Sequence, residues 1–214
     1  MIDISKKEQY KTIAHDGTAT IVEKKSKFIA TVKPVDNEDD AIAFVNSVKA
    51  KYPDARHNVY AYVIDENNIF RYSDDGEPQG TAGMPVLDTM RKDGIVDAAI
   101  VVTRYFGGIL LGTGGLVHAY GATAREGLLD AQIVMRTLCD IVAVRVDYTL
   151  SGKVQYILSA GGYEIEDTIY DNEVTYKVCV KCDETDSFLA KITDETNARA
   201  ICEKIDKKYV DLQN

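Results

Sequence analysis

Alternating and continuous runs of apolar residues recur through the first 135 residues of the chain and predict a series of β-strands. One run is apolar almost without interruption, which is typical of a strand buried on both faces in the centre of a sheet. The polar tetrapeptide Asp-Glu-Asn-Asn has the composition of a turn and predicts a hairpin between the two strands that flank it. The predicted strands are Thr18–Glu23, Phe28–Val35, Asn58–Ile64 and Ile69–Ser73, which flank the turn, and the apolar run Ala98–Tyr105.

Three further segments of the same region repeat apolar residues with the period of an α-helix. Asp36–Lys51 brings four apolar residues to one face, and Asp36 or Asn37 can cap its start. A short helix is predicted over Pro85–Met90, with the proline in the first turn. Leu116–Leu129 is predicted to be a long helix, because apolar residues recur there at every fourth position.

The last third of the chain has a simpler succession of patterns. The predicted elements are a strand over Ile141–Leu150, a helix over Gly152–Ala160, strands over Tyr163–Tyr170 and Glu173–Cys182, a helix over Asp186–Glu195 and a strand near Arg199–Ile205. Their order, β-α-β-β-α-β, is that of a ferredoxin-like unit. We therefore predict an α+β protein of two domains, over residues 1–136 and 137–214.

The charge balance restricts the classes of function. The 214 residues carry 34 acidic and 25 basic side chains, a formal net charge of −9 at pH 7. A protein that coats DNA non-specifically needs a surplus of Lys and Arg, so any contact with nucleic acid here requires a local basic patch. No apolar run approaches the roughly 20 residues that span a bilayer, and the start of the chain lacks the apolar core of a signal peptide. We expect a cytoplasmic protein with no membrane partner.

The four cysteines are interpreted as structural. Cys179 and Cys182 form a C-x-x-C motif, but they lie in a segment whose alternation predicts a half-buried strand. Residues three apart on a strand point to opposite faces, and no second C-x-x-C motif or nearby histidine completes a zinc site. We therefore predict neither a bound metal nor a cofactor.

Glycine is concentrated in the middle of the chain, where nine of the 15 glycines fall between Gly76 and Gly115. The predicted buried strand runs into Gly107-Gly108 and then into Gly112-Thr113-Gly114-Gly115, just before the long helix. Free N–H groups at a helix start favour an anion, and glycines allow close approach. The segment matches neither a phosphate-loop nor a dinucleotide-binding signature. Anion binding and tight helix–sheet packing therefore remain equally good explanations.

Charged residues accompany the glycines. Arg104, near the end of the predicted buried strand, is a candidate phosphate ligand or a partner for the acidic loop that holds Asp74, Asp75 and Glu77. We favour an internal pair between the arginine and an aspartate, since that loop supplies the acid. The three carboxylates also suit a hard divalent cation, although their spacing matches no EF-hand and the loop is good turn chemistry.

Evidence for catalysis is weak. His57 and His118 are candidate acid–base groups, but no nucleophile motif accompanies them. The residues therefore favour a binding surface over a catalytic centre. Its candidate members are His57, Arg104, Gly107, Gly108, Gly112, Thr113, Gly114, Gly115 and His118, with the acidic loop of Asp74, Asp75 and Glu77 opposite them.

Several long strings resemble the YigZ/Impact family. The matching segments are 24–30, 55–58, 73–78, 80–83 with Pro85, and 101–120. The resemblance implies an N-terminal domain like domain four of elongation factor G and a small-subunit ribosomal protein, followed by the small domain of bacterial members. One departure is His118, where the family pattern has arginine. If that position contacts phosphate, we expect weaker or pH-dependent binding in this chain.

Three functions are compatible with these features. Eukaryotic Impact relatives regulate translation under amino-acid stress, so the resemblance favours a non-enzymatic, translation-associated protein that binds RNA or the ribosome through a local basic patch. That patch has Lys24, Lys25, Lys27, Arg56 and Arg104 as its members. The alternative is a nucleotide- or phosphate-binding enzyme related to small-molecule kinases. A protein-binding module that uses the ferredoxin-like domain is the third.

Overall fold

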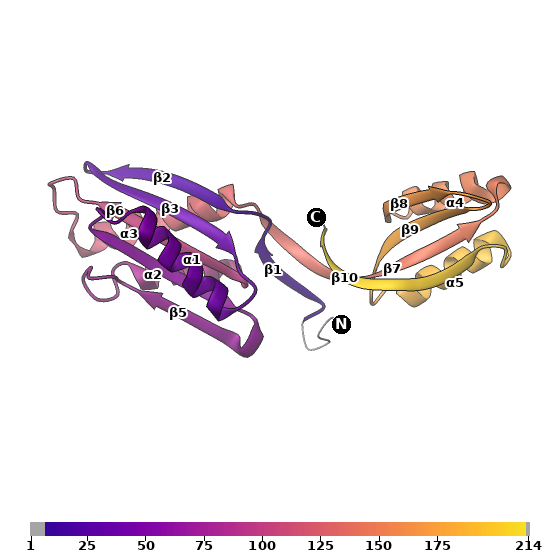
Figure 1. Cartoon of the computed structure of the whole chain (residues 1–214), viewed down its shortest axis with the longest axis horizontal. Helices are drawn as coiled ribbons and strands as arrows, with labels where there is room; N and C mark the ends of the chain where they lie inside the picture. The colour runs from indigo at the N-terminus through magenta and orange to yellow at the C-terminus, as the bar shows by residue number, and fades with distance from the viewer. Residues whose placement is uncertain (1–6, 213–214) are drawn as a thin grey trace. The chain divides into compact units, whose positions relative to one another are not determined.

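The computed structural model describes residues 7–212, which divide into two compact units (Figure 1). One unit comprises residues 10–135. The other comprises residues 136–212 together with residues 7–9. Each unit has its own hydrophobic core and mixes helices with antiparallel strands, so the predicted α+β class is confirmed.

A five-stranded antiparallel sheet forms the centre of the first unit. Its order is β2-β3-β6-β4-β5. The central position of β6 and the burial of its first seven residues, 98–104, explain the uninterrupted apolar run and confirm the prediction made from it. The strands are β2 (Gly17–Glu23), β3 (Ser26–Pro34), β4 (His57–Ile64), β5 (Ile69–Ser73) and β6 (Ala98–Tyr105).

Helices cover both faces of this sheet (Figure 1). On one face, α1 (Glu38–Lys51) packs on β4 and β6 through a small core that includes Phe44 and Val101. On the other face, α2 (Gly83–Asp93) and α3 (Gly112–Asp130) enclose the larger core. Asn37 caps α1 as expected, since its side chain accepts a hydrogen bond from the Asp40 amide at 2.8 Å.

Two helices of the first unit extend beyond their predicted limits. The α3 helix begins at Gly112, four residues before the predicted Leu116, and α2 begins at Gly83. Glycine has low intrinsic helix propensity, so a sequence pattern places these turns outside the helix. Strand β1 (Gln9–Ile13) and the short 3₁₀ turn η1 (Glu66–Asn68) were not predicted.

The second unit has the predicted ferredoxin-like order. Its strands pair as β8-β9-β7, with β10 on the other side of β7. Residues of α4 and α5 share one core with β7 and β9, and this core includes Tyr176 and Phe188. The elements are β7 (Ile133–Val146), α4 (Tyr148–Ala160), β8 (Glu164–Tyr170), β9 (Val174–Lys181), α5 (Thr185–Thr196) and β10 (Ile201–Leu212).

Several boundaries of this unit differ from the predictions: β7 begins at Ile133 instead of Ile141, and β10 runs to Leu212 instead of Ile205. The strand expected over Ile141–Leu150 ends at Val146, and α4 begins at Tyr148. Asp147 causes the change, because its Oδ1 accepts hydrogen bonds from the amides of Thr149 at 2.9 Å and Leu150 at 3.2 Å. An aspartate in this position is a strong helix start, and it overrides the alternation of apolar residues that continues past it.

The cysteines of the C-x-x-C motif are placed differently from the prediction. Cys179 is buried in β9, whereas Cys182 lies one residue beyond the end of that strand and does not share its alternation. Burial raises the pKa of the Cys139 thiol to about 11, with the neighbouring Cys179 and Cys182 adding to the shift.

Over residues 7–212, no group of three or more His, Cys, Asp or Glu side chains is arranged to hold a metal ion. Within the same residues, none of the helices combines the length and hydropathy of a bilayer span.

Candidate functional site

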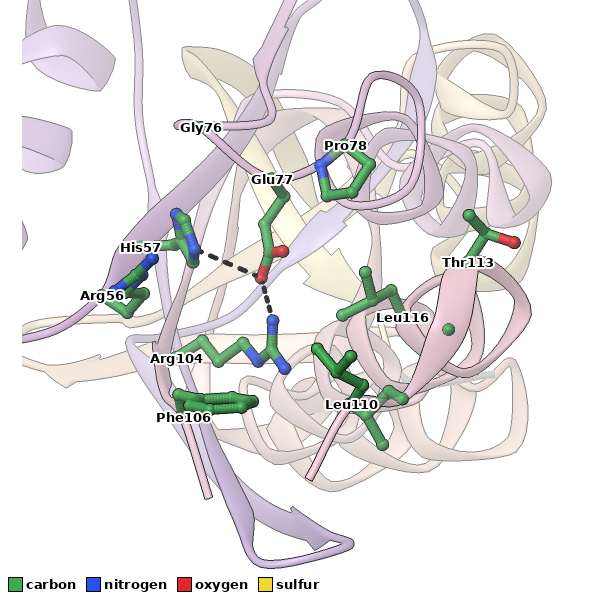
Figure 2. A pocket seen from close by; sticks show the side chains of 12 residues that line it. Arg56, His57, Gly76, Glu77, Pro78, Arg104, Phe106, Leu110, Thr113 and Leu116 are labelled. Carbon is green, nitrogen blue, oxygen red and sulfur yellow. Dashed lines mark hydrogen bonds and ion pairs between the residues drawn. The ribbon is translucent and has the colours of Figure 1, made fainter. Parts of the chain in front are cut away.

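The carboxylate of Glu77 lies at the centre of the candidate site. Its side chain is 4% exposed, and its Oε1 accepts hydrogen bonds from Arg104 Nη1 at 2.5 Å and from the Tyr120 hydroxyl at 2.8 Å. His57 Nε2 lies 3.8 Å from the same oxygen (Figure 2). These side chains come from the loop after β5, from β6, from α3 and from β4. Glu77 therefore connects its own loop to the sheet, through β4 and β6, and to the helix α3 that covers one face of the sheet.

Tyr120 acts as a hydrogen-bond donor in this cluster. Burial raises the pKa of the Tyr120 hydroxyl far above its ordinary value, and the adjacent charge of Glu77 raises it further. Arg104 lowers the pKa only in part. The hydroxyl therefore stays protonated at every physiological pH and donates a hydrogen bond to Glu77.

Arg104 is buried, with 6% of its side chain exposed. Its guanidinium lies over the rings of Phe28 and Phe106, at 5.4 and 5.7 Å from their centroids. The acid that pairs with it is Glu77, so the predicted pair with an aspartate is wrong in its partner. The Nε of Arg104 is buried without an acceptor in the described part of the chain.

The other two acids of the loop have separate partners. Asp74 accepts hydrogen bonds from the amides of Gly80, Ala82 and Gly83 at 2.8, 3.1 and 2.8 Å, at the start of α2. Asp75 contacts Lys49 Nζ at 3.0 Å and the Asn58 amide at 2.7 Å.

The three carboxylates of the loop thus face three different sets of donors. The alternative of a divalent cation held jointly by Asp74, Asp75 and Glu77 is therefore wrong. Two of these acids organise the backbone around the site, and the third neutralises Arg104.

His57 is held in one tautomer by the backbone. Its Nδ1 lies 2.7 Å from the carbonyl oxygen of Asp75. A carbonyl oxygen only accepts hydrogen bonds, so Nδ1 carries a proton and donates it. The Nε2 is left on the side of Glu77, where it is an acceptor in the neutral ring and a donor in the charged ring.

A pocket of about 500 Å³ opens above this cluster. Arg56 and His57 lie at one side of it and Thr113 of α3 at the opposite side, with Arg104 directed between them (Figure 2). Polar groups form the floor, and apolar side chains form the wall. The lining residues are Arg56, His57, Gly76, Glu77, Pro78, Arg104, Phe106, Leu110, Leu111, Gly112, Thr113 and Leu116.

The first turn of α3, whose Gly112 and Thr113 line this pocket, has unpaired amides. Leu111 occupies the N-cap position without a side-chain hydrogen bond, and the amides of Gly112, Thr113 and Gly114 have no acceptor within residues 7–212. Such amides, together with the helix dipole, attract an anion. The observed start of α3 at Gly112 therefore has free amides of the kind that the anion-binding explanation invokes.

The glycines before this helix have structural reasons of their own. A Cβ on Gly107 would lie 2.0 Å from the carbonyl carbon of Lys25, so this glycine permits the β2–β3 turn to approach. Gly108 and Gly112 have φ values of 81° and 74°, which favour glycine. A Cβ on Gly115 would lie 3.1 Å from the Leu111 side chain, whereas a Cβ on Gly114 would meet nothing within 4 Å. The packing explanation therefore holds for Gly107, with the turn rather than a helix as its partner.

His118 belongs to a different surface. It lines a separate pocket of about 540 Å³ between α2 and α3, together with Lys92 and Arg125. The expectation that His118 and Arg104 flank one glycine loop is wrong. One side of the first turns of α3 lines the pocket that contains Arg104, whereas His118 lies on another side of the helix and lines the second pocket. Position 118, where the family pattern has arginine, thus lines the pocket between α2 and α3 and does not line the pocket above Glu77.

Several residues of the site are absent from the candidates predicted from the sequence, among them Tyr120, Phe106 and Leu110. Tyr120 was interpreted as part of the apolar face of its helix, and Phe106 and Leu110 lie among the glycines. Phe106 is 49% exposed and Leu110 is 84% exposed. Large apolar residues at exposed positions beside a glycine loop were the available signal.

The fold and the site define a two-domain α+β protein with a pocket above a buried Arg104–Glu77 pair in its N-terminal unit. Residues 24–128 match the model of the Impact N-terminal domain, and residues 144–199 match a domain of unknown function, DUF1949. The chain belongs to the IMPACT family.

Relatives support this assignment over nearly the whole length. IMPACT family member YvyE of Bacillus subtilis (strain 168) is 38% identical over 94% of this chain and 94% of its own. IMPACT family member YigZ of Escherichia coli (strain K12) is 37% identical over 82% and 88%. A crystal structure of a hypothetical protein is 33% identical, with a TM-score of 0.59 over 94% of this chain and 98% of that one. The Dictyostelium discoideum IMPACT homolog is 39% identical over 49% of this chain and 31% of its own.

Proposed function

We propose that this protein is a non-enzymatic, translation-associated factor that binds RNA or the ribosome. The proposed contact surface lies around the C-terminal end of β6 and is here called the glycine-loop face. It consists of the turn at 24–27, Arg56 and the loop 106–111, which leads from β6 to α3. The family membership supports the proposal, and the arrangement of cations on this face carries it.

Four exposed cations gather around the C-terminal end of β6. Lys24 and Lys25 form the β2–β3 turn, whose backbone packs on Gly107. Lys27 pairs in register with Tyr105, and the Arg56 amide donates to the Arg104 carbonyl at 3.1 Å. Within residues 7–212 none of the four cations has an acidic partner, in contrast to Arg104 and Lys49. A cluster of unpaired cations is the feature that attracts a phosphate backbone.

Exposed apolar side chains accompany these cations. Phe106 follows β6 directly, and Leu110 lies four residues later in the same loop. Proteins that recognise single-stranded RNA combine a cationic track with aromatic surfaces on which bases stack. The glycine-loop face has both components, although the net charge of the whole chain is −9. The acidity of the remaining surface favours a local contact over general coating of nucleic acid.

Co-sedimentation with ribosomes and binding of a single-stranded RNA, both over a salt series, test the proposal. Lys27→Glu and Arg56→Glu are expected to weaken binding and each to lower the salt slope by about one. Lys33→Glu is the matched control, because Lys33 lies on the same strand as Lys27 but pairs with Ala99 at the other end of β6. Equal effects of the substitutions at 27 and 33, or no binding at low salt, would refute the proposal.

One observation favours a second candidate, an enzyme that acts on a phosphorylated small molecule. The pocket places His57 Nε2 beside a buried carboxylate, an arrangement suited to proton transfer. Calorimetry with nucleoside triphosphates and Mg²⁺, followed by product analysis, separates the two candidates. Turnover that disappears in His57→Gln would favour the enzyme, and binding without turnover would favour the binding protein.

A further inference from the structure

The pocket above Glu77 contains donors that the protein itself leaves unused. At one side, the first-turn amides of α3 have no acceptor within the described residues. On the floor, Arg104 Nε is buried and unpaired, while Nη1 donates to Glu77 and Nη2 lies 3.5 Å from Ser26 Oγ. A buried donor without a partner costs about 1–3 kcal/mol, and the side chain that carries this donor lines the pocket.

The electrostatic balance of the pocket favours an anion. Glu77 neutralises Arg104, which leaves Arg56 and the positive end of the α3 dipole as the remaining charges. Several amides at a helix start suit the tetrahedral oxygens of a phosphate. Glu77 is the only acidic side chain that lines the described pocket, and its charge is already paired with Arg104, so it does not oppose a bound anion.

The wall of the pocket accepts a planar apolar group. Phe106, Leu110, Leu111 and Leu116 line the pocket beside the Arg104 guanidinium, which lies 5.7 Å from the centroid of the Phe106 ring. Aromatic and guanidinium planes are the surfaces on which nucleobases stack. The volume of about 500 Å³ lies within the range of small-ligand sites.

We infer that this pocket binds one nucleoside 5′-monophosphate unit, with its phosphate on the first turn of α3 and its base against Phe106 and Leu110. The unit can be a free nucleotide or the 5′-terminal nucleotide of an RNA. The inference rests on the proposed function because it specifies how the glycine-loop face engages RNA. The lysine turn contacts the continuing backbone, and the pocket receives the terminal nucleotide.

Titration with AMP, followed by calorimetry and by the amide resonances of residues 112–115, tests the inference. Adenosine and inorganic phosphate are the partial probes. We expect AMP to bind at least tenfold more tightly than either and to shift these amides. Thr113→Asp places a charge at the pocket lining and is expected to abolish AMP binding. An acid in a first turn stabilises a helix, so this variant should remain folded.

Two controls separate charge from shape and position. Thr113→Asn has a similar size without the charge and is expected to retain AMP binding. Ser187→Asp adds the same charge to the exposed first turn of α5, in the other unit, and is expected to bind AMP as the unmodified protein does. Phe106→Ala should weaken AMP binding while leaving the response to inorganic phosphate unchanged.

RNA heptamers that differ only in a 5′-phosphate or a 5′-hydroxyl identify the source of the nucleotide. Tighter binding of the phosphorylated RNA, lost in Thr113→Asp, indicates the RNA terminus, and binding of AMP alone indicates a free nucleotide. Unmoved amides at 112–115, or equal AMP affinity of the Thr113→Asp variant, would overturn the inference. Salt-dependent binding of the 5′-hydroxyl RNA would then still support the proposed function, so the two can fail separately.

Discussion

Glu77 and Arg104 form a buried ion pair that joins the loop after β5 to the central strand of the first unit. Both side chains are at least nine-tenths buried, and the Nη1–Oε1 distance is 2.5 Å. A buried pair contributes little net stability, but loss of one partner leaves an uncompensated charge. The pair therefore determines how well the loop 74–83 is held against β6 and α3.

Glu77→Gln is expected to destabilise the first unit by about 3 kcal/mol, because the guanidinium of Arg104 loses its countercharge. The double variant Glu77→Gln with Arg104→Met should lose less stability than the two single variants added together. Urea unfolding measures the free energies of this cycle. Glu173→Gln, at an exposed position in the β8–β9 turn, is the control and should change stability by no more than about 0.5 kcal/mol. Strict additivity in the cycle would contradict the pairing.

Tyr120→Phe removes one donor from Glu77 while keeping the ring that packs edge-to-face on Phe28 at 5.1 Å. We expect a loss of about 1.5–3 kcal/mol, the cost of a hydrogen bond to a charged group. Spectrophotometric titration provides an independent check. Burial raises the pKa of Tyr120, so the variant should lose none of the tyrosine absorbance change that develops in the folded protein near pH 10. A smaller change near pH 10 in the variant would show that Tyr120 ionises there.

Gly107→Ala is expected to destabilise the first unit by about 3 kcal/mol, because the new Cβ would overlap the backbone of Lys25. The matched control is Gly114→Ala. A Cβ there meets no atom within 4 Å, and alanine is the better helix former, so stability should stay equal or rise by up to about 1 kcal/mol. Thermal unfolding of both variants decides, and similar melting temperatures would contradict the close approach of the turn.

Asp140 predicts a pH dependence of the second unit. Burial alone would raise the pKa of its carboxyl, but the hydrogen bond from Thr185 and the charge of Lys204 outweigh burial and lower it. A lowered pKa in the folded state means that the contribution to stability is present above the unfolded pKa and disappears as the pH falls through the folded value. Asp140→Asn should therefore be less stable than the unmodified protein at pH 7, with the difference shrinking below about pH 4. A difference that is constant with pH would contradict this.

The sequence predicted most elements of the fold where local chemistry and packing agree. The strand β6 is one example, because its uninterrupted apolar run matches its burial in the sheet. The cap at Asn37 is another, because its side chain bonds an amide only three residues later in the chain. At Asp147 these signals conflict, and the cap ended a strand that the alternation extends. The first turn of α3 was missed because its glycines oppose the helix locally, while the packing of the later turns on the sheet stabilises it.

The candidate site was predicted less completely, because its contacts join distant segments. The acidic loop and Arg104 were expected to pair, but the sequence does not distinguish which of the three acids within residues 74–77 is the partner. Only the fold directs Asp74 to the start of α2 and leaves Glu77 beneath Tyr120. His118 shows the opposite error, since proximity in the sequence suggested a shared site and helix geometry separated it from Arg104.

The neutralisation of Arg104 has a consequence for how the face responds to ionic strength. Attraction by exposed lysines weakens over a Debye length, about 8 Å at 0.15 M salt. In the proposed nucleotide site, attraction by the amides of α3 acts through short, directed hydrogen bonds inside a pocket where Glu77 has neutralised Arg104 and Arg56 is the remaining formal charge. Raising the salt concentration should therefore release the chain contacts at the lysine turn first. We expect binding of the terminal nucleotide in the proposed pocket site to persist, so that binding to the same surface becomes more selective as it becomes weaker.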